Sequence, residues 1–222
     1  NNVIYYYNIS TSNNSLGIYL IQYDQNSSFA KNNLSIATAN IFFRNNISSL
    51  GTAITIEGSS KNNFTNDTIT ACAVGCDSGY QDVKLLNSYY IKFLNVNLNK
   101  SRIFVDNSSN LALNWFLDVI LINKTGKNPL QGAEVIIKNI FGSTIFNGTT
   151  DANGKIPTQI ITELSMNGSV PFNSADNCVG INNVNLTCFN PYNITANITY
   201  TSSRITQILS VDRSKSVNIS LG

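Results

Sequence analysis

The chain of 222 residues contains no histidine, one methionine and one tryptophan. Without histidine, catalytic triads that use imidazole, helical zinc-protease motifs and the usual zinc or copper sites are excluded. The calcium-loop pattern D-x-[DN]-x-[DN]-G does not occur either. We therefore expect no metal and no cofactor, and we assign no catalytic residue.

Charge is also scarce, because only 12% of the residues are Asp, Glu, Lys or Arg, whereas about a quarter is typical. The 14 basic residues are scattered singly and the net charge is +2, so a phosphate-binding stripe for nucleic acid is not expected. No run of 18 apolar residues marks a membrane span, and the start is no secretory leader. We expect a processed mature protein or a segment of a longer one.

Uncharged polar residues take the place of the missing charges, with 36 asparagines, 25 serines and 18 threonines. Many of these asparagines lie in N-x-[S/T] triplets, called sequons below, which are acceptors of N-linked sugar. Chance at this composition would give about seven sequons, but the chain has sixteen. The excess predicts a heavily N-glycosylated protein that has passed through a secretory pathway. The candidate acceptors are Asn8, Asn13, Asn26, Asn33, Asn46, Asn63, Asn66, Asn99, Asn107, Asn123, Asn147, Asn167, Asn185, Asn193, Asn197 and Asn218.

The sequons at Asn63 and Asn66 lie end to end in KNNFTNDTIT, residues 61 to 70. In one straight strand, residues three apart face opposite sides. A corner between them would turn both outward. We expect at least one of the two to carry sugar.

Four cysteines form two local pairs, Cys72 with Cys76 and Cys178 with Cys188, although four cysteines allow three connectivities. A Cys-x3-Cys bridge requires a sharp reversal of the chain, which Gly75 permits. We predict two disulfides and an oxidising, extracellular setting, with four free buried thiols as the alternative.

The first half of the chain repeats short alternating segments, among them NNVIYYYNIS at 1 to 10, GIYLIQY at 17 to 23 and KNNFTNDTIT at 61 to 70. Asparagine suits the corners between such strands, because it tolerates left-handed turns and hydrogen-bonds its neighbours. These phrases resemble the right-handed parallel β-helix repeats of large secreted bacterial and archaeal surface proteins and of some carbohydrate-active enzymes. The resemblance implies a stacked solenoid over residues 1 to 114.

The pattern changes at Trp115, where WFLDVILINKTGKNPLQGAEVIIKN predicts two strands and a turn, and GTTDANGKI predicts a hairpin. This region resembles the carboxypeptidase regulatory-like, transthyretin-like family of Ig-like β-sandwiches. The resemblance lies in three successive motifs, L-x-V, G-x-x-PL-x-GA-x-V-x-I and T-T-D-x-x-G. The resemblance implies a sandwich over residues 115 to 222, with further strands at 194 to 202, 204 to 212 and 216 to 222. The expected fold class is all-β.

Two functions remain open. The first is a non-enzymatic, N-glycosylated structural protein or adhesin of the cell surface, archaeal by resemblance to glycan-dense surface layers and threads. Its coil-like start without a cap and its final strand SVNISLG suggest self-association into a homo-oligomer or filament.

The second is a carbohydrate-active, lyase-like or glycosidase-like β-helix protein with an accessory sandwich. Its site would use carboxylates and cations on the outer face of the coils. The candidates are Asp67, Asp77, Asp82, Asp106, Lys84, Lys92 and Arg102.

Overall fold

The structure is a computed structural model that describes residues 39–71, 79–168, 185–198 and 202–222, together with the backbone of three earlier strands. Within these residues the fold is almost entirely β, as predicted. The only helical element described is a single 3-10 turn, η1 (Lys100–Arg102). No described helix is long and apolar enough to cross a membrane.

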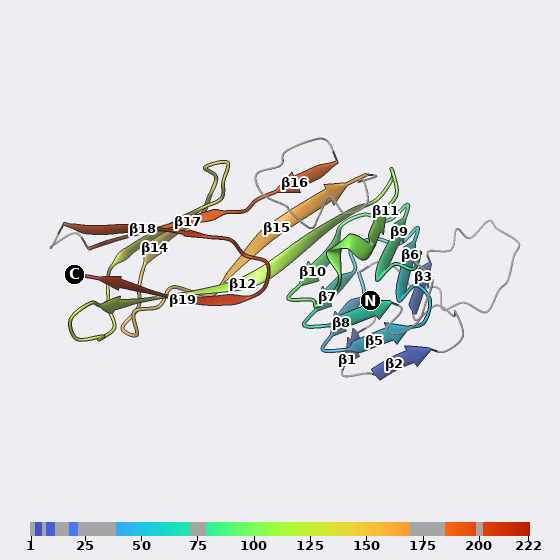
Figure 1. The fold of residues 1–222 in the computed structure, drawn as a ribbon, viewed down its shortest axis with the longest axis horizontal. Helices are drawn as coiled ribbons and strands as arrows, with labels where there is room; N and C mark the ends of the chain where they lie inside the picture. Colours follow the sequence, from blue (N-terminus) through green and yellow to red (C-terminus); the bar gives the residue numbers. More distant parts are fainter. Residues whose placement is uncertain are drawn as a thin grey trace, which may run out of the picture. The chain divides into compact units, whose positions relative to one another are not determined.

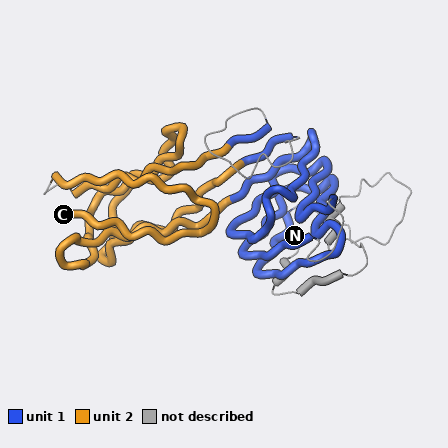
Figure 2. Tube along the Cα trace, viewed as in Figure 1, with its two compact units in different colours: residues 1–113, 165–177, 183–187 blue, residues 114–164, 178–182, 188–222 orange. Residues whose placement is uncertain are grey.

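The chain divides into two compact units (Figure 2). Unit 1 contains residues 1–113, 165–177 and 183–187, and unit 2 contains residues 114–164, 178–182 and 188–222. The units are therefore not contiguous in sequence, because the end of β15 (Gln159–Asn167) and most of β16 (Leu186–Cys188) belong with unit 1. The sequence prediction had placed all of 115 to 222 in the second domain.

Unit 1 is built from short strands in three separate sheets (Figure 1). Every pairing that links these strands is parallel. From β1 to β9 successive strands go to successive sheets, so each of these rounds of the chain adds one strand to each sheet, whereas the last round adds β10 and β11 only. The part of the first sheet that these strands form has the order β1-β4-β7-β10, the second sheet has the order β2-β5-β8 and the third β3-β6-β9-β11. The strands are β1 (Val3–Tyr5), β2 (Asn8–Thr11), β3 (Ile18–Ile21), β4 (Ile41–Phe43), β5 (Asn46–Ser49), β6 (Ile54–Glu57), β7 (Asn63–Thr65), β8 (Thr68–Ala71), β9 (Val83–Leu86), β10 (Ile91–Leu94) and β11 (Ile103–Val105).

The core of unit 1 consists of apolar side chains stacked in register from one round of the chain to the next. Phe42, Phe64 and Phe93 occupy the central positions of β4, β7 and β10, where alternation turns them inward. Their rings stack with centroids 4.4 and 4.9 Å apart. All three side chains are buried, so the stack is a continuous apolar column.

The corners of unit 1 are made by polar side chains that hydrogen-bond from one round to the next. The side-chain oxygen of Asn62 accepts hydrogen bonds from the backbone N–H and the side-chain amide of Asn40, at 3.1 and 2.8 Å. Asp67 accepts the same pair of bonds from Asn45, at 2.7 and 3.0 Å. These residues are buried, and their side chains satisfy backbone groups that the turning chain would otherwise leave unpaired.

Unit 2 is a two-sheet β-sandwich. One sheet has the order β14-β13-β17-β18 with antiparallel pairing throughout. The other contains β12 with β15 beside it and β19 pairing β12 in parallel, Leu117 opposite Lys215. The strands are β12 (Asn110–Asn123), β13 (Glu134–Lys138), β14 (Thr144–Thr149), β17 (Tyr192–Ile198), β18 (Ser203–Leu209) and β19 (Lys215–Leu221). Inward residues of both sheets, with Trp115 among them, form one buried cluster.

The Asp-Ala-Asn-Gly segment forms a tight turn but not the predicted hairpin, because β14 and β15 lie in different sheets. The Asp151 carboxylate accepts hydrogen bonds from the backbone N–H groups of Asn153 and Lys155. Gly154 has a φ of +70°, and a Cβ there would lie 2.3 Å from the Leu121 carbonyl oxygen. Only glycine fits, so the turn signal in the sequence reflects close backbone contact.

Candidate functional site

The sequon asparagines lie at the surface wherever the structure describes their side chains. Seven are exposed, namely Asn46, Asn99, Asn107, Asn147, Asn167, Asn193 and Asn218, and five are half-buried, namely Asn63, Asn66, Asn123, Asn185 and Asn197. The side chains of Asn8, Asn13, Asn26 and Asn33 lie outside the described residues. None of the twelve described sequon asparagines is buried. As acceptors must be accessible to the transferring enzyme, all twelve meet the first requirement.

Asparagines outside sequons behave differently. Twelve of them are also described, and five of these are buried: Asn40, Asn45, Asn62, Asn139 and Asn190. The buried ones bind backbone or corner groups, as Asn190 does with both the N–H and the carbonyl of Val211. Among the described residues, the buried asparagines and the possible sugar acceptors are thus two separate sets.

The adjacent sequons of KNNFTNDTIT are separated by a corner. Asn63 begins β7, Asn66 follows that strand with a φ of 57°, and β8 starts at Thr68. Both asparagines are half-buried, and Asn66 accepts a hydrogen bond of 2.6 Å from the side chain of Asn95. The segment is therefore a turn between two sheets, and neither asparagine points into the core.

Three sequons share the outer face of the β14-β13-β17-β18 sheet. Asn193 and Asn197 alternate along β17 with the buried Ile194. Asn147 on β14 lies opposite Ile136 of β13, which in turn lies opposite Thr195, on the same side as Asn193 and Asn197. Sugar on these positions would cover one broad face of unit 2.

Of the predicted disulfide cysteines, only Cys188 belongs to the described residues. It is buried on β16 and takes part in a disulfide. Cys72, Cys76 and Cys178 lie outside the described residues, so the predicted pairings remain predictions.

Unit 1 carries an open polar cleft of about 410 Å³, lined by Ile69, Thr70, Asp82, Asn97, Leu98, Asn99 and Arg102. The two carboxylate oxygens of Asp82 accept hydrogen bonds from the backbone N–H groups of Ala71, at 2.8 Å, and Asn99, at 2.7 Å. The Arg102 guanidinium donates to the Ala71 carbonyl at 2.7 Å. Asp82 is only 2% exposed, so it serves as an internal clamp between chain segments.

The pKa of Asp82 is set mainly by the burial of its side chain. Burial raises the pKa of the Asp82 carboxyl, and hydrogen bonds from Asn99 and Ala71, together with the Arg102 charge, oppose this without reversing it. A raised carboxyl pKa is a feature of general acids. Both oxygens of Asp82 are nonetheless occupied by backbone donors.

The remaining candidates for carbohydrate chemistry do not join this cleft. Asp106 binds Asn87, Ser108 and Ser109 in a turn, while Lys92 is exposed on β10. Lys84 on β9 lies over the Phe104 ring at 5.9 Å. Asp77 lies outside the described residues. Among the described residues of the predicted set, only Asp82 and Arg102 come together in this cleft.

Asp67 is buried at a corner of unit 1, and its Oδ2 atom has no hydrogen-bond partner among the described residues. Burial raises the pKa of the Asp67 carboxyl, and hydrogen bonds from Asn45 only partly offset this. Among the described residues no group of three or more Asp, Glu or Cys side chains converges as a metal site would require.

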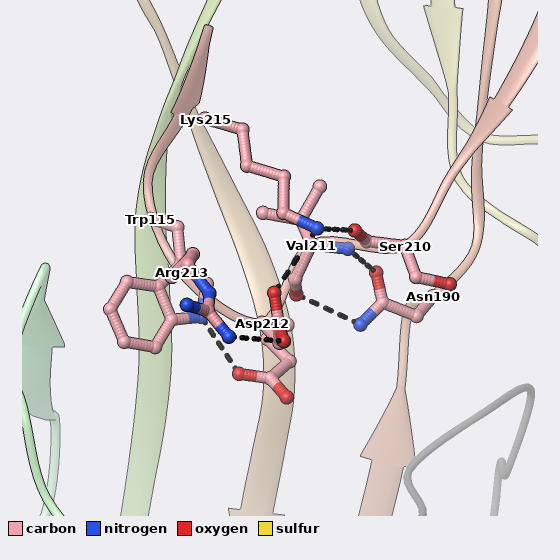
Figure 3. Close-up of polar contacts among 8 residues, drawn as sticks. Trp115, Asn190, Ser210, Val211, Asp212, Arg213 and Lys215 are labelled. Atoms are coloured by element: carbon pink, nitrogen blue, oxygen red, sulfur yellow. Dashed lines mark hydrogen bonds and ion pairs between the residues drawn. The ribbon is translucent and has the colours of Figure 1, made fainter.

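Sequence reasoning missed the polar contacts at the sandwich, several of which Figure 3 shows. The Trp115 indole donates a 2.7 Å hydrogen bond to the carboxylate of Glu163, which is buried. Asp212 accepts from Arg213 and Lys215, at 3.4 and 3.1 Å. Burial alone would raise the pKa of Asp212, but these partners lower it to about 2. No periodic pattern predicts the contact of Trp115 with Glu163, because these residues lie 48 positions apart in the chain.

No protein-family model matches the chain, and no curated protein sequence matches it. Similar solved structures include the Bacillus anthracis TIE protein, with a TM-score of 0.34 and 14% identity over 51% of this chain and 18% of that chain. The major pilin subunit BcpA of Bacillus cereus has a TM-score of 0.28 and 15% identity over 49% of this chain and 30% of that one.

The 5-hydroxyisourate hydrolase of Klebsiella pneumoniae has a TM-score of 0.27 and 16% identity, covering 48% of this chain and 90% of that chain. The chain thus spans less than a third of the length of the TIE protein and of BcpA. Likenesses at this level assign neither a family nor an activity.

Proposed function

We propose that the chain is a non-enzymatic, N-glycosylated structural protein or adhesin of a cell surface, located outside the cell. In this proposal sugars supply the hydration that charged side chains supply in other proteins. Unit 1 is a right-handed parallel β-helix and unit 2 a carboxypeptidase regulatory-like sandwich, and the chain self-associates. Dense sequons with few charges also favour an archaeal source by resemblance.

The observation that carries the proposal is the separation of the asparagines into two sets. A sequon that arises by chance has no reason to avoid the interior of a chain in which five of the other described asparagines are buried. All twelve described sequon asparagines nevertheless lie at the surface. Selection for acceptor use explains this, since a buried acceptor cannot carry sugar and remain folded.

The β-helix assignment rests on the three parallel sheets of unit 1. Corresponding corner residues recur 22 residues apart, as in Asn40 and Asn62, and 29 residues apart, as in Asn66 and Asn95. Parallel strands joined by crossovers are right-handed in nearly all proteins, so the coils are expected to have that hand. Such coils stack rather than close, and solenoids of this kind form extended surfaces.

The self-association proposal rests on the edges of the β14-β13-β17-β18 sheet. β14 and β18 are its outermost strands, and β18 bears two exposed isoleucines, Ile205 at 38% and Ile208 at 69%. An edge strand with exposed apolar residues is a template for pairing with another chain. A second copy of this chain is the proposed partner.

Glycopeptide mass spectrometry of the protein from its natural source tests the glycan proposal. We expect sugar on most of the sixteen sequons, with each acceptor assigned individually. Bare asparagine amides at nearly all of them would refute the proposal.

Sedimentation velocity over a range of concentrations tests self-association. We expect Ile208→Lys to shift the protein toward monomer, because a lysine on an edge strand opposes pairing. Ile160→Lys is the matched control, since Ile160 is also exposed, at 56%, but lies on β15. Equal assembly of both variants and the unmodified chain would remove β18 from the interface, and a monomer at high concentration would refute self-association altogether.

The carbohydrate-active alternative draws on one observation, the cleft that contains Asp82 and Arg102. Its test is turnover of uronic-acid polymers by the folded protein, measured by the absorbance of unsaturated products. We expect no turnover. Activity that Asp82→Asn abolishes would favour the alternative, and Lys84→Ala serves as a control outside the cleft.

A further inference from the structure

We propose that Asn99 and Asn123 are two sequons that remain competent sugar acceptors in the folded chain, because their side chains are held in a reactive conformation. The inference rests on the proposed glycosylation and extends it, since it ranks sequons by geometry. The ligand class is a sugar linked through its anomeric carbon to a lipid phosphate or pyrophosphate.

In both sequons the hydroxyl group of the triplet bonds back to its own asparagine. The Oδ1 atom of Asn99 accepts from the Ser101 backbone N–H at 3.1 Å and from the Ser101 hydroxyl at 2.7 Å. The Oδ1 atom of Asn123 accepts from the Thr125 N–H at 2.9 Å and from the Thr125 hydroxyl at 2.7 Å. Two segments from different parts of the fold thus adopt the same double-donor arrangement.

This arrangement addresses the chemical difficulty of the reaction. The amide nitrogen is a weak nucleophile, because its lone pair is delocalised into the carbonyl. In transfer, the Nδ2–C1 bond to the sugar forms and the bond from C1 to the phosphate oxygen breaks. The phosphate leaves with the bonding electrons, and one Nδ2 proton passes to a base of the transferase. Negative charge builds on Oδ1 as that proton leaves, and two fixed donors stabilise it.

Access to the nitrogen is also preserved. Asn99 is exposed and Asn123 is half-buried. Neither Nδ2 atom donates a hydrogen bond within the described part of the chain, so both remain available for transfer. Asn99 also precedes η1 and Asn123 ends β12, so both triplets lie in turns, where a transferase can reach the backbone.

Two other described sequons, those of Asn107 and Asn197, each lack one of these features. Asn107 is exposed, but its triplet hydroxyl belongs to Ser109, which is buried and donates to Asp106 at 2.6 Å. Asn197 directs its own Nδ2 toward the carboxylate of Glu134, at 3.4 Å. Asn107 is therefore the matched comparison, since it has the exposure of Asn99 without the double-donor geometry.

The test is glycosylation in vitro of the full unglycosylated chain, folded with its cystines. The probe is a single-subunit oligosaccharyltransferase that needs no more than N-x-[S/T], with a lipid-pyrophosphate oligosaccharide as donor. Occupancy at each sequon is followed over time by glycopeptide mass spectrometry. Each rate is divided by the rate for a short synthetic peptide of the same sequon, which removes effects of local sequence.

We expect normalised rates at Asn99 and Asn123 to exceed that at Asn107 by about tenfold, the effect of one or two net hydrogen bonds. Asp106→Ala frees the Ser109 hydroxyl and should raise the rate at Asn107, with the rate at Asn99 in that variant as a control for folding. Equal rates at all three sites, or no modification of any folded sequon, would overturn the inference. Sugar on the natural protein is a separate measurement, so failure of the ranking is distinguishable from failure of the proposed function.

Discussion

The aromatic column of unit 1 gives the sharpest prediction about stability. Phe64 lies between Phe42 and Phe93, with ring centroids 4.4 and 4.9 Å away, and its side chain is fully buried. Phe64→Ala removes the ring and both stacked contacts. Replacement of a buried phenylalanine by alanine costs about 3–5 kcal/mol, and each aromatic pair contributes about 0.5–1.5 kcal/mol beyond its area.

The upper part of that range applies here, because the strands on either side of Phe64 are fixed by parallel pairing and cannot collapse into the cavity. We expect a loss of about 4–5 kcal/mol. With a urea dependence of about 2 kcal/mol per molar, the midpoint of the unit 1 transition should fall by about 2 M. Phe64→Leu keeps most of the volume and should cost only about 1–2 kcal/mol.

Urea titration followed by far-UV circular dichroism measures both variants. Phe104→Ala is the control, because Phe104 is 40% exposed on the outer side of β11 and should cost less than about 1 kcal/mol. A midpoint for Phe64→Ala within about 0.5 M of the Phe104→Ala midpoint would refute the reasoning.

Three further predictions concern buried polar groups. Burial raises the pKa of Asp67 above 3.8, so the contribution of this carboxyl group to stability falls as the pH rises from that value toward neutrality. Asp67→Asn should therefore be more stable than the unmodified chain at pH 7, by about 1 kcal/mol or more. In urea titrations the difference between the two should close toward pH 4. Glu163→Ala leaves the Trp115 N–H without its acceptor and should lower the free energy of unfolding by at least about 1–3 kcal/mol, as measured by tryptophan fluorescence. Glu163→Gln keeps an acceptor and should cost less. Equal losses of stability in the two variants would contradict this. Asn190→Ala unpairs both backbone groups of Val211 and should lower stability by about 2–4 kcal/mol in thermal unfolding, with an unchanged midpoint as the contrary result.

Local pattern predicted much of the fold. Alternation of apolar and polar residues identified the strands around Phe64 and Ile69, because one face of each must be buried. The Asp-Ala-Asn-Gly residues correctly predicted a tight turn at Asp151, but they did not predict which sheets the flanking strands join. The sequon excess led to the surface positions now seen for Asn193 and Asn218.

Other features depend on distances that no local pattern contains. The bond from Asn40 to Asn62 requires a repeat of 22 residues, and the next repeat is longer, at 29. The contact of Trp115 with Glu163 spans 48 residues of chain. The sequence predicted a short strand that starts at Trp115, where the residue pattern changes, but β12 begins at Asn110. Backbone pairing thus extends across the point where the composition of the chain changes.

The hydrogen bonds between polar side chains at the corners of unit 1 affect the solution conditions that this unit can withstand. A link such as Asn40 to Asn62 joins two neutral amides, so dissolved ions have no charge to shield and acid has no group to protonate. High salt and low pH should therefore not weaken the hydrogen bonds that join successive rounds of the chain at such corners. Where a carboxylate replaces the amide, as at Asp67, the strength of the link between rounds depends on the pH of the solution.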